Sequence, residues 1–69
     1  MQDILVQFGS RLKELRTGKK LTQEQFANRS GLHKNYIGMV ERGERNPSLK
    51  NIQIIAKTLE ISISELMNF

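Results

Sequence analysis

The stretch from Gln23 to Pro47 restricts the fold of this 69-residue chain more than any other part of it. Thr22, just before this stretch, and Gln25 have the spacing of a capping box. A helix therefore begins there and runs to about Ser30. Gly31 then supplies a tight turn, because glycine adopts backbone conformations that cost other residues. A second short helix follows the turn. The stretch therefore predicts two short helices joined by a glycine.

Apolar residues before and after these two helices recur every three or four positions, which is the spacing of one helix face. Gly18 suits the left-handed position that ends a helix, and a second capping box is formed by Ser62 and Glu65. The apolar face of the first segment consists of Ile4, Phe8, Leu12 and Leu15. The face of the segment after Pro47 consists of Leu49, Ile52, Ile55, Ala56 and Leu59.

No segment favours a β-strand. We therefore expect one all-α domain of five helices, a compact helical fold with short connections. The expected helices span about residues 4–16, 22–30, 34–42, 49–59 and 63–68.

Length and composition limit the kind of protein this is. A domain of 69 residues has a marginal core, to which a dimer interface would add burial. The chain has no cysteine, which excludes disulfides, thiolate metal sites and cysteine nucleophiles. No apolar run has the length of a signal-peptide core or a membrane span. We therefore expect a soluble cytoplasmic protein that does not interact with membranes.

The net charge of +4 is unevenly distributed along the chain. Residues 16–50 carry a formal charge of +5, and the rest of the chain carries −1. This basic excess coincides with the two short helices and attracts polyanions in general. A solvated basic surface is the alternative reading, and charge alone does not decide. The charged residues of the segment are Arg16, Lys19, Lys20, Arg29, Lys34, Arg42, Arg45 and Lys50 against Glu24, Glu41 and Glu44.

A set of short motifs accompanies the two short helices. They are Gln23, Ala27, Gly31, Ile37 and Val40, then Glu41-Arg42-Gly43, Asn46-Pro47-Ser48 and Ser62-Ile63-Ser64-Glu65-Leu66. With these motifs the chain resembles the Cro/C1-type helix-turn-helix regulators, which include phage repressors, restriction–modification controller proteins and many small bacterial regulators. The resemblance covers about residues 8–66. A lone Gln-to-Val spacing is a weak signal, but its combination with the other motifs is highly specific.

The resemblance implies a lambda repressor-like DNA-binding fold with its helix-turn-helix at about residues 22–42. In this architecture the second helix of the motif enters the major groove. Lys34 and Asn35 on its first turn are then candidates for base contacts, since lysine suits guanine O6 and N7 and asparagine suits adenine N6 and N7. Both are also ordinary exposed helix residues, and Lys34 can equally contact phosphate alone.

Gly38 and Met39 are two further candidates for base contact on the same helix. Glycine inside a helix costs about 1 kcal/mol relative to alanine. Gly38 either lets the backbone approach the groove floor or a thymine methyl, or is tolerated at an exposed site. Met39 either touches a thymine methyl or covers the surface. His33 occupies the N-cap of this helix, where relatives commonly carry serine or aspartate, and histidine caps poorly. It is either a phosphate contact or a spectator, and we expect a spectator.

Contacts with phosphates fix the register of a protein on a duplex. The resemblance makes six residues candidates for them, namely Gln23, Tyr36, Arg42, Arg45, Asn46 and Lys50. Tyr36 either points its hydroxyl at a phosphate or is partly buried in the core. By the same resemblance Arg16 pairs with Glu41 and holds the second helix of the motif, so Glu41 is read as structural.

The C-terminal region has more apolar residues than one small core can bury. Ile54 lies off the inward face of its helix, Ile63 lies off that of the last helix, and Met67 belongs to the same set. A leftover apolar patch usually marks an interface. A homodimer through residues 48–68 would place two recognition helices about 34 Å apart, one turn of DNA. The alternative is partial exposure at a frayed terminus, which fits Phe69 best.

Taken together, these features predict a sequence-specific transcriptional regulator, such as a repressor or controller protein. It would bind double-stranded DNA at a pseudo-palindromic operator as a homodimer, with RNA polymerase as a further candidate partner. The alternative is an antitoxin-like or adaptor module that binds another protein, against which the basic loop and the polar helix face argue. We expect no cofactor, no metal and no enzyme activity, because the sequence offers no nucleophile–base pair, carboxylate pair or phosphate-binding glycine loop.

Overall fold

The computed structural model describes residues 3–69, in which five α-helices and no strand are present. The all-α prediction is therefore confirmed for this part of the chain. The helices are α1 (Ile4–Gly18), α2 (Gln23–Ser30), α3 (Lys34–Glu41), α4 (Leu49–Leu59) and α5 (Ile63–Leu66).

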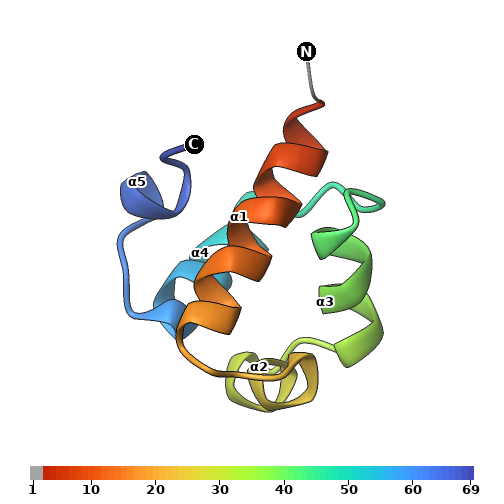
Figure 1. Cartoon of the computed structure of the whole chain (residues 1–69), viewed down its shortest axis with the longest axis vertical. Coiled ribbons are helices and arrows are strands. Elements are labelled where there is room, and N and C mark those ends of the chain that lie inside the picture. Colours follow the sequence, from red (N-terminus) through yellow and green to blue (C-terminus); the bar gives the residue numbers. More distant parts are fainter. Residues whose placement is uncertain (1–2) are drawn as a thin grey trace.

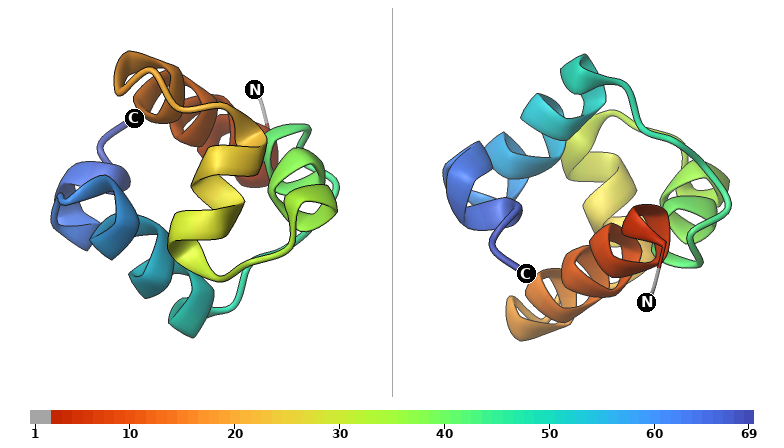
Figure 2. Two further views of the ribbon diagram at one scale, coloured as in Figure 1. Left: turned by 90° about the horizontal axis from the view of Figure 1, so that it is seen from below. Right: turned by 90° about the horizontal axis from the view of Figure 1, so that it is seen from above.

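The helices are packed around one core (Figure 1). The long helix α1 packs on α3, while α2 packs on both α3 and α4, and α5 packs against the end of α4. Figure 2 shows α2 crossing between α3 on one side and α4 on the other. Every helix contributes to the buried core, which consists of Phe8, Leu12, Leu21, Phe26, Ala27, Ile37, Val40, Ile55, Ala56, Leu59 and Leu66.

Side chains cap the N-termini of the helices, as the sequence predicts for α2. Thr22 Oγ1 accepts the Gln25 N–H at 3.1 Å, and Gln25 Oε1 accepts the Thr22 N–H at 2.9 Å, so the capping box is confirmed. The predicted position of His33 at the N-cap of α3 is confirmed. Its Nδ1 atom accepts the Asn35 N–H at 3.2 Å and so replaces the oxygen of the usual cap at the start of α3.

Some helix ends differ from the prediction. Helix α1 continues through Gly18, and the left-handed residue that ends it is Lys20, with φ of 60°. The Leu21 N–H closes this turn by donating to the Arg16 carbonyl at 3.2 Å. The chain leaves the helix where Leu21 can enter the core, which outweighs the local preference of glycine. Helix α5 ends at Leu66 instead of Asn68, and α3 ends one residue early, at Glu41.

Two residues assigned to inward faces are exposed. Ile4 is 60% exposed and Leu49 is 76% exposed. Both stand in the first turn of their helices, and the first turn of α1 extends beyond the neighbouring helices (Figure 1). Helical spacing alone placed them on the apolar faces, but no other element covers them at these ends.

Helix α3 is held very close to α1 at Gly9. A Cβ atom on Gly9 would lie 2.6 Å from the carbonyl oxygen of Glu41 and closer still to that of Val40. Real Cβ atoms do not approach so closely, so the contact requires glycine. Gly9 thereby sets the distance between α1 and the C-terminal end of α3.

Candidate nucleic-acid interface

A hollow of about 140 Å³ lies where the start of α2 meets α3. It brings together all four predicted base-contact residues and two of the predicted phosphate-contact residues. Its lining consists of Gln23, Lys34, Asn35, Gly38, Met39 and Arg42. Lys34 and Asn35 are exposed on the first turn of α3, and Met39 is half-buried. The residues that the sequence singled out separately therefore form one surface.

Gly38 is buried, so the reading that it is tolerated at an exposed site is wrong. A Cβ atom there would lie 3.1 Å from Arg42 Nη1 and 3.6 Å from Gln23 Oε1. The side chains of Gln23 and Arg42 thus lie over the backbone of α3 at this point. Because glycine has no side chain, these two polar groups can lie close to the helix.

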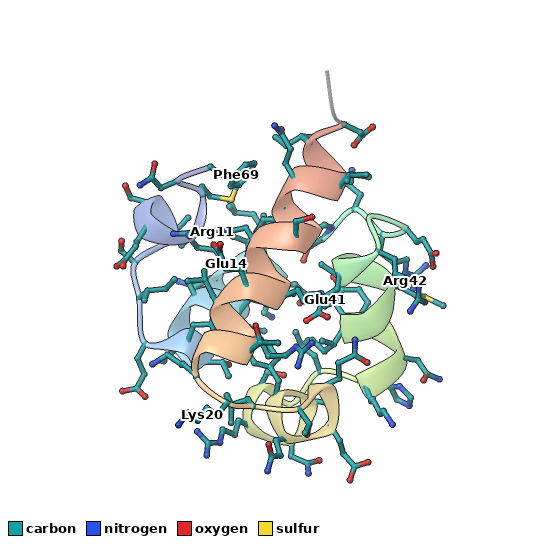
Figure 3. All side chains as sticks on the ribbon, viewed as in Figure 1. Arg11, Glu14, Lys20, Glu41, Arg42 and Phe69 are labelled. Atoms are coloured by element: carbon teal, nitrogen blue, oxygen red, sulfur yellow. The ribbon has the colours of Figure 1, made fainter. Side chains whose placement is uncertain are left out.

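Under this surface, α3 is fixed to α1 by a buried ion pair. Arg16 Nε donates to Glu41 Oε2 at 2.6 Å, and Arg16 Nη2 donates to Glu41 Oε1 at 3.0 Å. The two side chains are only 8% and 3% exposed. Figure 3 shows Glu41 pointing toward α1, whereas Arg42 points away from the core. The predicted pairing of Arg16 with Glu41 is confirmed, and its two-pronged geometry fixes the orientation of α3.

Gln23 is joined to the same pair. Its Nε2 atom donates to Glu41 Oε1 at 3.0 Å, which fixes the orientation of its side-chain amide. An amide nitrogen carries two N–H groups, so a second donor of Gln23 remains. The buried pair therefore also positions a predicted phosphate contact at the start of α2.

Two predicted DNA contacts make ion pairs with neighbouring acids. Lys34 Nζ lies 3.9 Å from Glu24 Oε2, and Arg42 Nε lies 3.1 Å from Glu44 Oε2. All four side chains are more than half exposed. Exposed pairs of this kind are worth only about 0–1 kcal/mol, so both cations are readily released to another anion.

Tyr36 lies at the contact between α3 and α4. Its ring is half-buried against the core, and its hydroxyl oxygen accepts the Asn51 Nδ2–H at 3.0 Å. The guanidinium of Arg45 lies 5.9 Å from the centre of the ring, within the range of a cation–π contact. Partial core burial is therefore correct for Tyr36, and its hydroxyl remains at the edge of the core. Asn51 was not foreseen, because nothing in its local sequence marks it as a partner of a tyrosine fifteen residues earlier.

The loop from α3 to α4 carries the remaining polar candidates. Arg45, Asn46 and Lys50 are all exposed, whereas Pro47 between them is buried. Gly43 begins the loop with φ of 76°, a left-handed conformation that glycine adopts without strain. Pro47 thus anchors a loop whose polar side chains face solvent.

A second hollow, of about 470 Å³, lies between α4 and α5. Two of the three predicted dimer residues, Ile54 and Ile63, line it. The third, Met67, does not line the hollow and packs against the core instead. The full lining is Gln53, Ile54, Ala56, Lys57, Ile61 and Ile63.

Between residues 3 and 69, no cluster of three or more His, Cys, Asp or Glu side chains is arranged to hold a metal ion. No helix in that range has both the length and the apolar character needed to cross a membrane.

Comparison with known proteins places the chain in a family. The family model described as Helix-turn-helix matches residues 12–66. The control protein C.MunI from Mycoplasma sp is 44% identical, over 99% of this chain and 93% of C.MunI.

Two solved structures have the same fold at substantial sequence identity. The restriction-modification controller protein C.AhdI from Aeromonas hydrophila aligns with a TM-score of 0.87 and 56% identity, over 90% of this chain and 94% of that one. The controller protein C.Esp1396I, whose tetramer was crystallised with its natural 35 base-pair operator, aligns with a TM-score of 0.85 and 33% identity, over 97% and 92%. The resemblance read from the sequence is therefore confirmed, and this chain belongs to the helix-turn-helix family.

Proposed function

We propose that this protein is a sequence-specific, double-stranded DNA-binding transcriptional regulator of the controller-protein kind. The observation that carries the proposal is the surface around Gly38, where six predicted DNA-contact residues meet on α2 and α3. The buried pair of Arg16 and Glu41 holds that surface rigid. Similarity to C.MunI and C.AhdI supports the controller subtype.

In the proposed complex, α3 lies in the major groove. Lys34 and Asn35 read base edges from the first turn of α3, where side chains reach furthest into the groove. Met39 presents its thioether side chain to the groove floor, while Gly38 leaves room for the polar side chains of Gln23 and Arg42 over α3. The phosphate contacts come from the periphery, namely from Gln23, Tyr36, Arg42, Arg45, Asn46 and Lys50.

The regulator acts as a homodimer through α4 and α5. The hollow lined by Ile54 and Ile63 is an apolar surface on the described monomer that a second copy would cover. A two-fold dimer would place the two α3 helices about one turn of DNA apart and would match a pseudo-palindromic operator. The similar protein C.Esp1396I was crystallised as a tetramer with its operator, which supports oligomeric DNA binding. A protein with this role works in the cytoplasm, and RNA polymerase is the natural further partner of a DNA-bound regulator.

Selection of bound sites from a library of random duplexes tests the proposal. We expect recovered sites with two symmetric half-sites. DNA affinity should fall steeply as the salt concentration rises, because binding releases counterions from the DNA and this release is less favourable at high salt. Protein that shifts no duplex even at low salt would refute DNA binding and favour the adaptor-module alternative. Recovered sites without symmetry would refute only the dimer.

A further inference from the structure

Tyr36 and Asn51 share a hydrogen bond between α3 and α4. The Asn51 side-chain nitrogen donates to the Tyr36 hydroxyl oxygen at 3.0 Å. The phenolic hydroxyl has one proton and accepting lone pairs. Since the Asn51 N–H occupies one accepting position, the tyrosine proton has to point away from Asn51. No group among residues 3–69 accepts that proton.

The surroundings of the hydroxyl suit an anion. Arg45 lies over the face of the Tyr36 ring, 5.9 Å from its centre. Lys50 stands next to Asn51 at the start of α4 and is exposed. The nearest part of the chain in sequence, from Arg45 to Lys50, has no acidic residue. A donor hydroxyl on a ring that Arg45 covers, next to a segment with basic and no acidic residues, suits a backbone phosphate.

We propose that Asn51 is a positioning residue for DNA binding, which keeps the Tyr36 hydroxyl turned outward as a donor to a phosphate. Asn51 acts through Tyr36 and need not touch DNA. The inference rests on the function proposed above and goes beyond it by giving a role to a residue outside the predicted contact set. An amide suits this role, because a carboxylate would accept the tyrosine proton and present oxygen lone pairs to the phosphate.

The substitution Asn51→Asp reverses the hydrogen bond without removing it. The side chains are nearly isosteric, and residue 51 lies in the first turn of α4 with its N–H bonded to the Ser48 cap. A carboxylate in the first turn of a helix is favourable, so the thermal midpoint should not fall. A loss of DNA affinity would then not come from a loss of folding.

The experiment is a double-mutant cycle in DNA affinity, with Tyr36→Phe as the second change. We expect Tyr36→Phe to raise the Kd for DNA about tenfold when both subunits of the dimer carry the substitution, which corresponds to about 1.4 kcal/mol. Asn51→Asp should raise Kd in the wild-type background by at least about tenfold more than it does in the Tyr36→Phe background. The added negative charge acts equally in both backgrounds, so the difference isolates the direction of the hydrogen bond.

A second measurement locates the phosphate. Methylphosphonates placed singly along one half-site remove one backbone charge at a time. At one position, the methylphosphonate should weaken DNA binding by the wild-type protein. The same methylphosphonate should leave the DNA affinity of the Tyr36→Phe and Asn51→Asp variants unchanged. Equal losses from Asn51→Asp in the two backgrounds, or no loss, would overturn the role of Asn51 while DNA binding itself stands. Wild-type protein that binds no duplex would overturn the proposed function, and the positioning role with it.

Discussion

Replacing Gly9 by alanine adds a single methyl group at the closest contact between α1 and α3. The new carbon would lie 2.6 Å from the carbonyl oxygen and 2.8 Å from the carbonyl carbon of Glu41. These are backbone atoms, which cannot rotate away as a side chain can. The new carbon would also lie 2.4 Å from the Val40 carbonyl oxygen, so the two helices have to separate by at least roughly 0.6 Å to reach 3.0 Å. Overpacking of this kind typically costs about 1–3 kcal/mol.

Helix propensity opposes this cost, because alanine is favoured over glycine inside a helix by about 1 kcal/mol. Two backbone carbonyls meet the new methyl group at once, so the steric cost falls at or above the upper end of its range. The expected net loss is about 2 kcal/mol. For a domain of this size about 1 kcal/mol shifts the melting temperature by about 4–8 °C, so Gly9→Ala should lower it by roughly 8–16 °C.

Gly18→Ala is the matched control, since Gly18 is in the same helix and a Cβ there would have nothing within 4 Å. In this variant the higher helix propensity of alanine is not opposed by a steric clash, so we expect the melting temperature to rise by a few degrees. Both variants are compared with the parent by thermal unfolding at one protein concentration, because the proposed dimerisation would couple stability to concentration. A Gly9→Ala protein as stable as Gly18→Ala would refute the claim that the close approach of α1 sets the position of α3.

Three further predictions concern the buried pair, the DNA-contact surface and the dimer. Glu41→Ala should cost about 3–5 kcal/mol in urea unfolding, because it leaves the buried Arg16 guanidinium without its partner; a cost below about 1 kcal/mol would mean that water or other groups replace Glu41. Lys34→Ala should lose about 1–3 kcal/mol at one operator position and relax the preference there, whereas Arg42→Ala should weaken all duplexes about equally and flatten the salt dependence. Unchanged operator preference in Lys34→Ala, read from site selection, would remove Lys34 from base readout. Ile54→Asp should shift sedimentation toward the monomer by placing a charge in the hollow between α4 and α5, and an unchanged dimer would locate the interface elsewhere.

The features that the sequence predicted well are those that depend on neighbours along the chain. The capping box of Thr22 and Gln25, the turn at Gly31 and the existence of all five helices follow from spacings of a few residues. The pairing of Arg16 with Glu41 spans 25 positions and was foreseen only through the family resemblance. Local spacing is a reliable guide because capping and helix periodicity involve residues within one or two turns.

Tertiary structure decided what packs against what. It left Ile4 and Leu49 exposed although their spacing assigned them to apolar faces, since no other helix reaches the ends where they stand. It covered Gly38 with side chains from elsewhere in the motif. These outcomes depend on how whole helices lie against one another, which short spacings in the chain do not encode.

The stretch from Gln23 to Pro47 shows the same division. By itself the sequence determined that two capped helices meet at a glycine and that their polar residues suit DNA. Only the tertiary structure revealed that Gly9 lets α1 and α3 approach closely and that Asn51 donates a hydrogen bond to the hydroxyl of Tyr36. The physical reason is distance along the chain: Gly9 acts on a helix about thirty residues away, and Asn51 on a ring fifteen residues before it. Such contacts form only when the completed core brings α1, α3 and α4 together.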